Sequence, residues 1–526
     1  MSGPATSESL LPTSSALPAA AAAAAAVGDD RPGVAEWLAG RSVLVTGATG
    51  FLGQLLVEKL LRSCPEVATI YLLVRERRGE PPQKRIDRIL DDQLFDRVRC
   101  RRDKLVLVSG DLSEPDLGLK PEDRAKLVRS VNVILHSAAT VRFDAPLRTA
   151  AAINVRATRE LLRLAHEMKE LLSLVHVSTM YSHCPQPRIE ERVYKPRMSC
   201  DQLLNIVEAL DDETLDRITP ELMRPWPNSY VFTKAIAEDV VLRESKGLPV
   251  CVIRPSMVVS TTNEPVPGWI NNINGPAGVI IGSGLGLLRT LHIDTEISDL
   301  IPADLVTNTI CAAAWRTANS RKENISVIAE GEEIPVYNCV SSARNPISWD
   351  KVFEICPENG FHYPSEHCIW YFCLFRNKSL LMHYILRVLL HLIPAIIVDT
   401  FLRIAGRKPM LWKAYGKIHK FLDITDYFRS HEWTFTDTNM QSLWSELKES
   451  DKKIFPCNAA DLDWEENIKN WIPGMRMYFL KDPLNTVEKA KVKYNRLKLM
   501  HYTLVAAFWL LVIQMLWWTL SWVLSM

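Results

Sequence analysis

The sequence lacks several of the patterns that assign a function directly. Its eleven cysteines are scattered, with no CxxC pair and no histidine cluster, so neither a zinc site nor a disulfide framework is expected. Free thiols are typical of the cytosolic side of a membrane. The net charge is only +1, which argues against a nucleic-acid partner because no broad basic excess is present to neutralise phosphates. We therefore assign no metal ligand, and 526 residues provide enough core for two domains.

The first 36 residues have little that can pack. They contain Pro, Ser and an alanine run at 19–26, and the basic residues of a signal peptide's start are missing. We expect a disordered tail over residues 1–36 and assign it no function.

Three glycines in the run VLVTGATGFLG, residues 43–53, are the most informative motif in the first half of the chain. An apolar strand pattern precedes them at 42–45, and an apolar helical pattern follows at 54–62. Glycine allows a tight turn and the close approach of a pyrophosphate to backbone N–H groups at the positive end of a helix. The sequence thus predicts a dinucleotide-binding turn. Its candidate contacts are Thr46, Gly47, Thr49, Gly50, Phe51, Leu52 and Gly53.

The end of the second expected strand, residues 68–74, bears on which nucleotide binds. An enzyme for the unphosphorylated cofactor places Asp or Glu there, to accept from the ribose 2′-hydroxyl. This chain has Arg75, followed by Arg77 and Arg78. A guanidinium pairs well with a 2′-phosphate, so NADPH is favoured over NADH. A solvated basic loop is the alternative.

Further apolar runs at 105–109, 131–136, 172–177 and 250–253 alternate with helical patterns. This alternation predicts an α/β fold with a doubly wound, parallel Rossmann-type sheet. Ligands of such sheets lie beyond the carboxyl ends of the strands. The residues that follow the strands are therefore further candidate cofactor contacts: Asp111, Leu112, Ala138, Ala139, Pro255 and Ser256.

A tyrosine and a lysine four residues apart precede the last of these strands. Tyr230 and Lys234 share one face of the expected helix. An ammonium beside a phenol favours the phenolate, so we expect Lys234 to lower the pKa of Tyr230 and make it a general acid for a carbonyl oxygen. Lys234 is also placed to reach the cofactor ribose. Thr179 is the candidate second donor to that oxygen, with Ser178 as its substitute.

The carboxyl end of the chain is strongly apolar. Residues 503–525 carry no charge and are long enough to cross about 30 Å of hydrocarbon. Residues 481–501 hold six Lys and Arg against two acidic residues, which predicts a tail anchor with everything before residue 503 on the cytosolic side. The stretch 379–404 is also apolar, but His383, Arg387 and His391 recur in it. An interfacial helix, a tunnel wall and an ordinary packed helix remain open for it.

Several of these motifs together resemble the fatty acyl-CoA reductases, alcohol-forming members of the extended short-chain dehydrogenase/reductase superfamily. The resemblance rests on TGATGFLG, LLVR, HSAATVRF, VHVSTMYS, the Tyr/Lys pair, VIRPS and above all EPVPGWINNINGP and HLIPAIIVD. The wording LHLIP is closest to insect members. The resemblance implies a catalytic domain over residues 37–345, a helical substrate-holding domain over 346–500 and the anchor at 503–525. It also implies that two NADPH reduce a long-chain acyl-CoA to a primary alcohol through an aldehyde.

Other functions and routes remain open at this point. A membrane-bound hydroxysteroid dehydrogenase or epimerase shares the Tyr/Lys pair and the glycines. A catalytically silent protein that binds acyl-CoA shares the anchor. A thiolate route through Cys184 is the mechanistic rival, although most such cysteines are small buried hydrophobes. Family members occur on the endoplasmic reticulum and on peroxisomes, and the oligomeric state is not predicted.

Overall fold

The centre of the computed structural model, which describes residues 31–77, 79–322 and 333–526, is a seven-stranded sheet. Its order is β12-β7-β5-β4-β1-β2-β3, and every neighbouring pair is parallel. The crossover between β1 and β4 gives the doubly wound arrangement of dinucleotide-binding folds, so the predicted fold class is confirmed. The strands are β1 (Ser42–Thr46), β2 (Thr69–Val74), β3 (Leu105–Ser109), β4 (Val133–His136), β5 (Ser173–Val177), β7 (Val250–Pro255) and β12 (Val336–Cys339).

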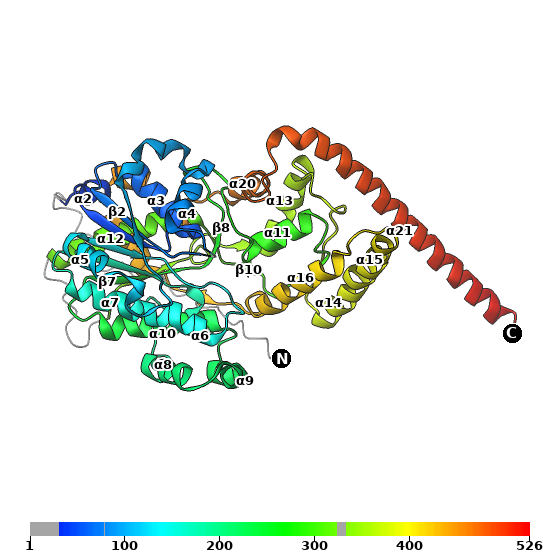
Figure 1. Ribbon diagram of the computed structural model, residues 1–526. Helices are drawn as coiled ribbons and strands as arrows, with labels where there is room; N and C mark the ends of the chain where they lie inside the picture. The colour runs from blue at the N-terminus through cyan, green and yellow to red at the C-terminus, as the bar shows by residue number, and fades with distance from the viewer. Residues whose placement is uncertain (1–30, 78, 323–332) are drawn as a thin grey trace, which may run out of the picture.

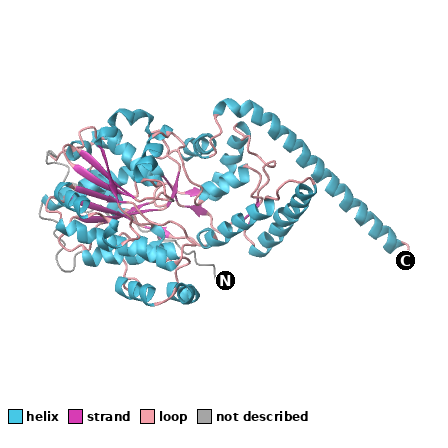
Figure 2. Cartoon of the chain, viewed as in Figure 1, coloured by secondary structure: helices cyan, strands magenta, loops and turns pink. Residues whose placement is uncertain are grey.

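Helices cover both faces of this sheet (Figures 1 and 2). Successive residues of β1 enter opposite cores, as expected for a strand buried on both sides: Val43 and Val45 in one, Leu44 in the other. The first core is closed by α3 (Phe51–Ser63), α4 (Pro82–Leu90) and α12 (Ala303–Lys322). The second core is closed by α5 (Pro121–Ser130), α6 (Leu147–Ala150), α7 (Ala157–Glu167), α8 (Cys200–Ala209), α9 (Asp212–Met223) and α10 (Ser229–Glu244).

The remaining helices form a second unit beside the carboxyl ends of the strands (Figure 1). Its core joins Ile280, Trp349, Leu422 and Trp471. Its helices are α11 (Pro276–Gly284), α13 (Trp349–His362), α14 (Leu380–Arg387), α15 (Ile393–Ile404), α16 (Leu411–Thr425), α17 (Tyr427–Ser430) and α20 (Trp464–Gly474). Its short strands include β9 (Thr290–His292), which pairs with β14 (Phe375–Asn377), and β10 (Ile297–Ser298), which pairs with β13 (Ile347–Ser348).

The two units are interleaved, so the expected boundary at residues 345 and 346 does not separate them. The loop at 260–275 still packs on α3 and α12 through Trp269, but Ile270 and α11 after it join the core of the helical unit. Conversely, residues 434–457 return to the sheet domain, where β15 (Thr434–Phe435) pairs with β6 (Arg188–Ile189). The helices α18 (Thr438–Glu446) and α19 (Glu449–Ile454) follow, and Leu443 and Phe455 lie in the first core.

The packed part of the chain begins earlier than the sequence predicts. Of the tail expected at residues 1–36, residues 1–30 lie outside the described residues. The last few residues of the expected tail are described, and they are packed. Pro32 accepts a 2.8 Å hydrogen bond from the Trp315 indole, and the Val34 N–H donates to Asp451 at 3.1 Å. Trp37, in the short helix α2 (Val34–Leu38), is fully buried. The expected end of the tail, at residue 36, is therefore a few residues too late. The sequence does not show this because the packing partners, residues 315 and 451, are distant along the chain.

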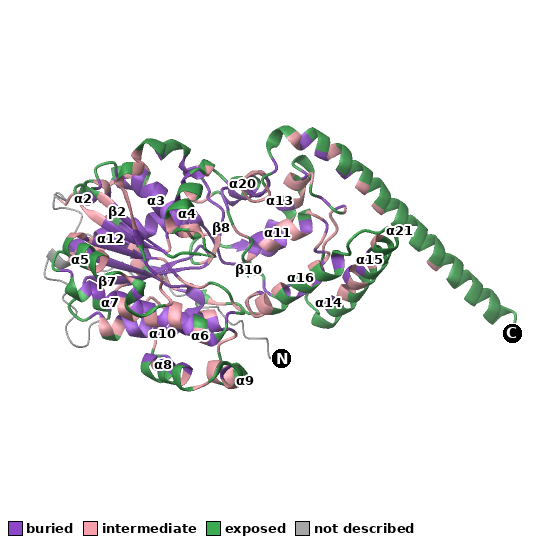
Figure 3. Ribbon diagram, in the orientation of Figure 1, coloured by how far each residue is buried: buried purple, intermediate pink, exposed green. Residues whose placement is uncertain are grey.

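The last helix, α21 (Val487–Leu524), extends away from the body (Figure 1). Its first turns pack through buried Ala490 and Tyr494, and beyond residue 502 its side chains are almost all exposed (Figure 3). The segment 484–524 has a mean hydropathy of 1.8 in its most apolar stretch, and none of that stretch is buried. Its length and composition are those of a helix that crosses a membrane.

Candidate active site

The glycine turn lies at the carboxyl end of β1. Gly47 has φ +76°, and a Cβ there would lie 2.8 Å from the backbone of Ala138, which follows β4. A Cβ at Gly53 would lie 2.0 Å from the Gly47 carbonyl oxygen. Glycine at these two positions therefore lets strand, turn and helix approach more closely than any side chain allows.

The turn presents the amino terminus of α3 as an anion site. The N–H of Gly50 donates to Gly47 O at 2.8 Å, and α3 begins at Phe51 with no acidic residue in its first turn. The first N–H groups of the helix, those of Phe51, Leu52 and Gly53, have no carbonyl within the helix to bind. Together with the helix dipole they suit a pyrophosphate.

The two threonines of the motif stabilise the turn through their side chains. Thr46 Oγ1 lies 2.7 Å from His136 Nδ1, and Thr49 Oγ1 accepts a 2.8 Å bond from Arg85 Nη2. Thr46 is fully buried. The Thr46 hydroxyl therefore bonds to another residue of the protein, so any contact between Thr46 and a nucleotide is made by its backbone.

Basic side chains gather at the end of β2. Arg75 is half exposed and lies 3.8 Å from the Asp111 carboxylate, which also accepts bonds from Ser113. Arg85, on α4, donates to the Arg75 carbonyl at 3.2 Å. Burial, with repulsion from Arg77 and Arg75, lowers the pKa of Arg85. A site where cations repel one another attracts an anion. Arg78, the third arginine expected here, lies outside the described residues.

The other strand-end candidates divide into two groups. Ala138 lies against the glycine turn, and its N–H donates to Thr46 Oγ1 at 3.4 Å; Ala139 and Leu112 follow at the same edge. Pro255 ends β7 and Ser256 follows it; β7 lies next to β5, and two strands, β5 and β4, separate it from β1 and its glycines. The N–H of Ser178 bonds to Ile253 on this side. Pro255 and Ser256 therefore lie on the Thr179 side of the site.

Tyr230 and Thr179 come together at this edge of the sheet. The side chain of Asn228 caps α10 by accepting from Val231 N at 3.1 Å, which places Tyr230 in the first turn. The Thr179 side chain lies close enough to the Tyr230 phenol to lower the pKa of that phenol. The Tyr230 ring stacks on Phe143 with centroids 5.7 Å apart. The predicted pair of proton donors thus lies at one point, although the two residues are distant in sequence.

Lys234 does not lower the pKa of Tyr230, and this expectation was wrong. Burial raises the pKa of Tyr230 to about 12, and the nearby Thr179 side chain partly offsets this rise. The Lys234 ammonium is buried and bonds to Val177 O at 2.7 Å and His176 Nε2 at 3.2 Å instead. Burial lowers the pKa of Lys234 to about 8. Sequence spacing places the two residues on one helix face but does not show where the ammonium bonds.

Ser178 faces a buried ionic network and not Tyr230. Its hydroxyl donates to Glu238, whose carboxylate also binds Ser182, His183 and Arg254. Burial alone would raise the pKa of Glu238, but Arg254 and His183 hold it well below its usual value. Of the two candidate second donors, only Thr179 lies beside Tyr230.

The thiol of Cys184 is unsuited to nucleophilic attack. It is buried, and burial raises its pKa to about 12, so little thiolate exists at neutral pH. All eleven cysteines lie in the described residues and are free. No cluster of three metal-binding side chains occurs among the described residues.

Comparison with known proteins decides the family. Two family models, both described as male sterility protein, match residues 45–310 and 390–482. Fatty acyl-CoA reductase 1 of Rattus norvegicus is 39% identical over 482 residues, 89% of this chain and 90% of its own. The chain belongs to the fatty acyl-CoA reductase family. The fatty acyl-CoA reductase wat of Drosophila melanogaster is 38% identical, with 90% of both chains covered, so these values do not separate insect from mammalian members.

The fold of this family member is also that of reductase domains from peptide and polyketide synthetases. The terminal R domain of the myxalamid pathway has a TM-score of 0.54 at 20% identity, covering 85% of this chain and 93% of that domain. The R domain of a nonribosomal peptide synthetase from Mycobacterium tuberculosis has a TM-score of 0.53, also at 20% identity, covering 83% and 92%. These two structures share the Rossmann-type fold. The oxidoreductase role and the nicotinamide cofactor rest on the fatty acyl-CoA reductase relatives and on the family model over residues 45–310.

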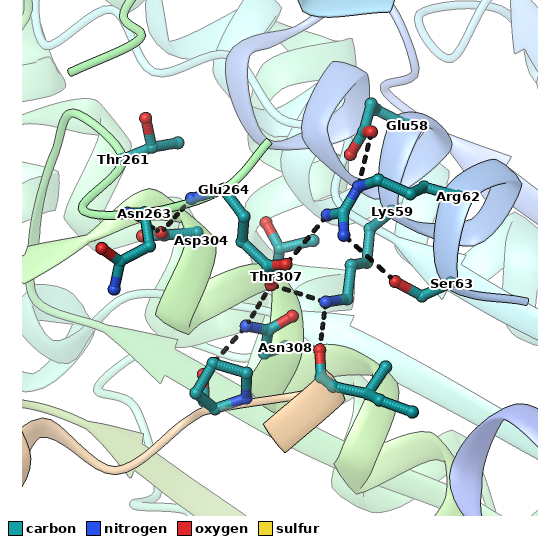
Figure 4. A network of polar contacts seen from close by, with 12 residues as sticks. Glu58, Lys59, Arg62, Ser63, Thr261, Asn263, Glu264, Asp304, Thr307 and Asn308 are labelled. Carbon is teal, nitrogen blue, oxygen red and sulfur yellow. Dashed lines mark hydrogen bonds and ion pairs between the residues drawn. The ribbon is translucent and has the colours of Figure 1, made fainter. Parts of the chain in front are cut away.

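The segment EPVPGWINNINGP, residues 264–276, proves to lie over the cofactor turn of this reductase-family chain. Glu264 forms ion pairs with Lys59 at 2.5 Å and Arg62 at 3.0 Å on α3 (Figure 4). Asp304, at the start of α12, accepts from the backbone N–H groups of 262, 263 and 264 at 2.8–3.1 Å. Trp269 then stacks on Phe51 with centroids 5.4 Å apart. The loop therefore packs along α3, from Phe51 at its start to Arg62 near its end.

Sequence reasoning missed three of the site's side chains. Arg85 lies ten residues after Arg75. The only feature of the sequence that pointed to Arg85 was its position in the basic helix that follows. His176 was visible only as a polar residue within an apolar strand. Glu238 follows Lys234 by one helical turn and carries no motif.

Proposed function

We propose that this protein reduces long-chain fatty acyl-CoA to the primary fatty alcohol in two steps, using two NADPH and passing through the aldehyde. The observation that carries the proposal is the placement of Tyr230 beside Thr179 at the carboxyl edge of the sheet. It occurs in a chain that aligns with fatty acyl-CoA reductase 1 over most of its length.

The residues present fit NADPH. The glycine turn, with the N–H groups that open α3, suits the pyrophosphate. Arg75 and Arg85, with the Thr49 bond between helix and turn, suit the 2′-phosphate. Lys234 uses two of its three N–H groups on Val177 and His176, which leaves one for a ribose hydroxyl.

Bound NADPH supplies the hydride to the acyl carbon. A Tyr230 whose pKa is about 12 is protonated at neutral pH, which is the state that a proton donor to the acyl oxygen needs. Thr179 donates a second hydrogen bond to the same oxygen. The hydroxyl of the resulting hemithioacetal returns its proton to the Tyr230 phenolate as the C–S bond breaks, which releases CoA as the thiolate and gives the aldehyde. The same two donors then serve the aldehyde oxygen, so no acyl-enzyme is required.

An apolar cavity supports a long acyl chain as substrate. It lies in the helical unit and is lined by Ile280 of α11, Phe353 of α13, Met475 after α20 and Tyr494 of α21. Its lining is mostly apolar, as in sites that hold hydrophobic ligands. Its wall includes the first turns of the proposed anchor.

We also propose that α21 anchors the protein to a membrane, with the rest of the chain on the cytosolic face of the endoplasmic reticulum or peroxisomes. Deletion of residues 503–526 should leave a soluble protein that is active on short or detergent-dispersed acyl-CoA, because these residues are exposed. Complete loss of activity in a folded truncated protein would contradict this separation of roles.

The test of the reaction is purified protein with NADPH and a C16 to C18 acyl-CoA, the product being identified by mass. Fatty alcohol with two NADPH consumed supports the proposal. Tyr230→Phe should lower kcat by about 100-fold or more, since it removes the proton donor. Cys184→Ala is the matched control and should leave kcat unchanged. Absence of NADPH oxidation would favour a silent acyl-CoA-binding protein, and the opposite pattern of the two variants would overturn the mechanism.

A further inference from the structure

The helix formed by α14, the π-helical turn Val388–Leu392 and α15 has its polar side chains inside and its apolar side chains outside. This stretch, Leu380–Ile404, has a mean hydropathy of 2.0 in its most apolar window, of which only 17% is buried. Three of its four buried residues are instead polar: His383, His391 and Asp399 are each at most 5% exposed, and the fourth is Ala395. A helix that packs on a soluble protein normally has the reverse arrangement.

Each buried polar residue binds the helical unit. His383 Nδ1 lies 3.1 Å from Thr290 Oγ1 on β9, and His391 Nε2 accepts from the Arg289 N–H at 2.9 Å. Asp399 accepts from three backbone N–H groups that open α16, at 2.9–3.0 Å. These bonds fix which side of the helix faces outward.

The outward side is continuous and strongly apolar. Leu381, Phe401 and Ile404 are about 70% exposed, and the residues between them that share this side are half exposed. The spacing of three and four residues keeps them on one stripe along the helix. Those residues are Ile385, Val388, Leu389, Ile393, Ile396 and Ile397. A stripe of this length is more apolar surface than soluble monomers normally expose.

The stripe adjoins the point where α21 leaves the body. His391 binds Arg289, whose guanidinium lies 5.6 Å from the centre of the Trp370 ring. The Trp370 indole in turn donates to His501 of α21 at 3.2 Å. His501 is in the last turn before the exposed apolar part of α21. The helix that carries the stripe is therefore linked to the proposed anchor through Arg289 and Trp370.

Basic residues border the stripe on its other side. From residue 400 to residue 422 the chain has six Lys and Arg and no Asp or Glu. Arg403, Arg407, Lys408 and Lys413 are exposed there, together with Trp412. Cations and tryptophan next to an apolar helix face are typical of helices that lie in the headgroup region of anionic membranes.

We infer that the outer face of α14 and α15 is a second membrane contact, half-sunk in an anionic leaflet beside the root of α21. The helix lies in the leaflet and does not cross it, because crossing would break the bonds of His383, His391 and Asp399 to β9 and α16. The inference rests on the proposed anchor, which brings this face to the bilayer. It gives the body a fixed orientation on the membrane, with the apolar cavity close to the lipid from which an acyl chain comes.

The test uses the full-length protein in vesicles of phosphatidylcholine and phosphatidylserine that contain a phospholipid with a photoreactive group in its acyl chain. Cross-linked peptides are mapped by mass spectrometry. We expect lipid adducts in 380–404 as well as in 503–526. Ile397→Glu with Phe401→Glu should lower the adducts in 380–404 by about tenfold or more, since a charge in hydrocarbon is costly, and leave those in 503–526 unchanged. Ala125→Glu with Asn205→Glu, at exposed positions of α5 and α8, adds the same charge and should change neither set.

The outcomes separate this inference from the proposed function. Adducts in 503–526 without adducts in 380–404 would overturn the inference and leave the anchor in place. Adducts in neither segment would overturn both the contact and the anchor. Activity of each variant on detergent-dispersed acyl-CoA reports the fold and the reaction independently of the membrane.

Discussion

Arg85 offers the sharpest test of cofactor choice, because the site's nicotinamide chemistry does not itself distinguish NADPH from NADH. Its guanidinium lies 2.8 Å from Thr49 in the glycine turn and 3.2 Å from the carbonyl of Arg75. A phosphate on the ribose at the end of β2 would meet this guanidinium. We therefore predict that Arg85→Ala weakens NADPH binding selectively.

The magnitude follows from the lost interaction. One hydrogen bond to a charged group contributes about 1.5–3 kcal/mol, which corresponds to roughly a 10- to 100-fold rise in the KM for NADPH. The kcat should change little, since Arg85 does not approach Tyr230 or Thr179 in the structure. The KM for NADH should stay constant, because NADH has no 2′-phosphate. Steady-state kinetics with saturating acyl-CoA and each cofactor in turn measure these changes.

The control addresses the structural role of Arg85. Thr49→Val keeps the shape of the turn but removes the oxygen to which Arg85 donates. If Arg85 acts through the turn alone, Thr49→Val should reproduce its effect with both cofactors. An equal rise in the KM values for NADPH and NADH in Arg85→Ala would refute the assignment of the 2′-phosphate to this residue.

Two further predictions concern buried charges. Because burial lowers the pKa of Lys234 to about 8, kcat/KM should fall as the pH rises through about 8, where the ammonium loses its proton. Lys234→Arg stays charged in this range, so its pH–rate profile should not show that fall. If the fall persists in Lys234→Arg, Lys234 is not the titrating group. Glu238→Gln should cost about 3–5 kcal/mol of stability, because it leaves the fully buried Arg254 without its counter-charge. A thermal melt should show a Tm lower by about 5 °C or more, whereas Asp239→Asn, which loses only an ion pair with half-exposed Arg243, should change it little. Equal Tm values for the two variants would contradict the role given to the network.

Much of the sheet could be predicted because its signals are local. The strand at 42–45, the glycines after it and the helix at 54–62 are contiguous, and hydrophobic periodicity reports such segments directly. The boundary between the domains could not be found this way. Residues 434–457 return to the sheet domain through contacts such as that of Asn439 with Glu191, nearly 250 positions away. No local pattern encodes a pairing at that distance.

The apolar stretch at 379–404 is a second feature whose role local sequence patterns did not determine. Its composition left three readings open, since a stripe of histidines is compatible with a buried, an interfacial or a tunnel-lining helix. The structure decides which side is buried: His391 meets Arg289, and Asp399 meets the start of α16. Only these partners show that the apolar side is the one left outside.

The sequence by itself determined the doubly wound sheet, the glycine turn, the helix that carries Tyr230 and Lys234, and the apolar end of the chain, because each depends on residues within a few turns of one another. The tertiary structure alone decided that Thr179 meets Tyr230, that Ser178 turns to Glu238, and that the ammonium of Lys234 bonds to β5 and leaves the phenol with a raised pKa. Each of these three findings depends on which buried groups become neighbours in the folded protein. In a protein interior each polar atom bonds to the partner that packing places nearest, and spacing along the chain does not fix that partner.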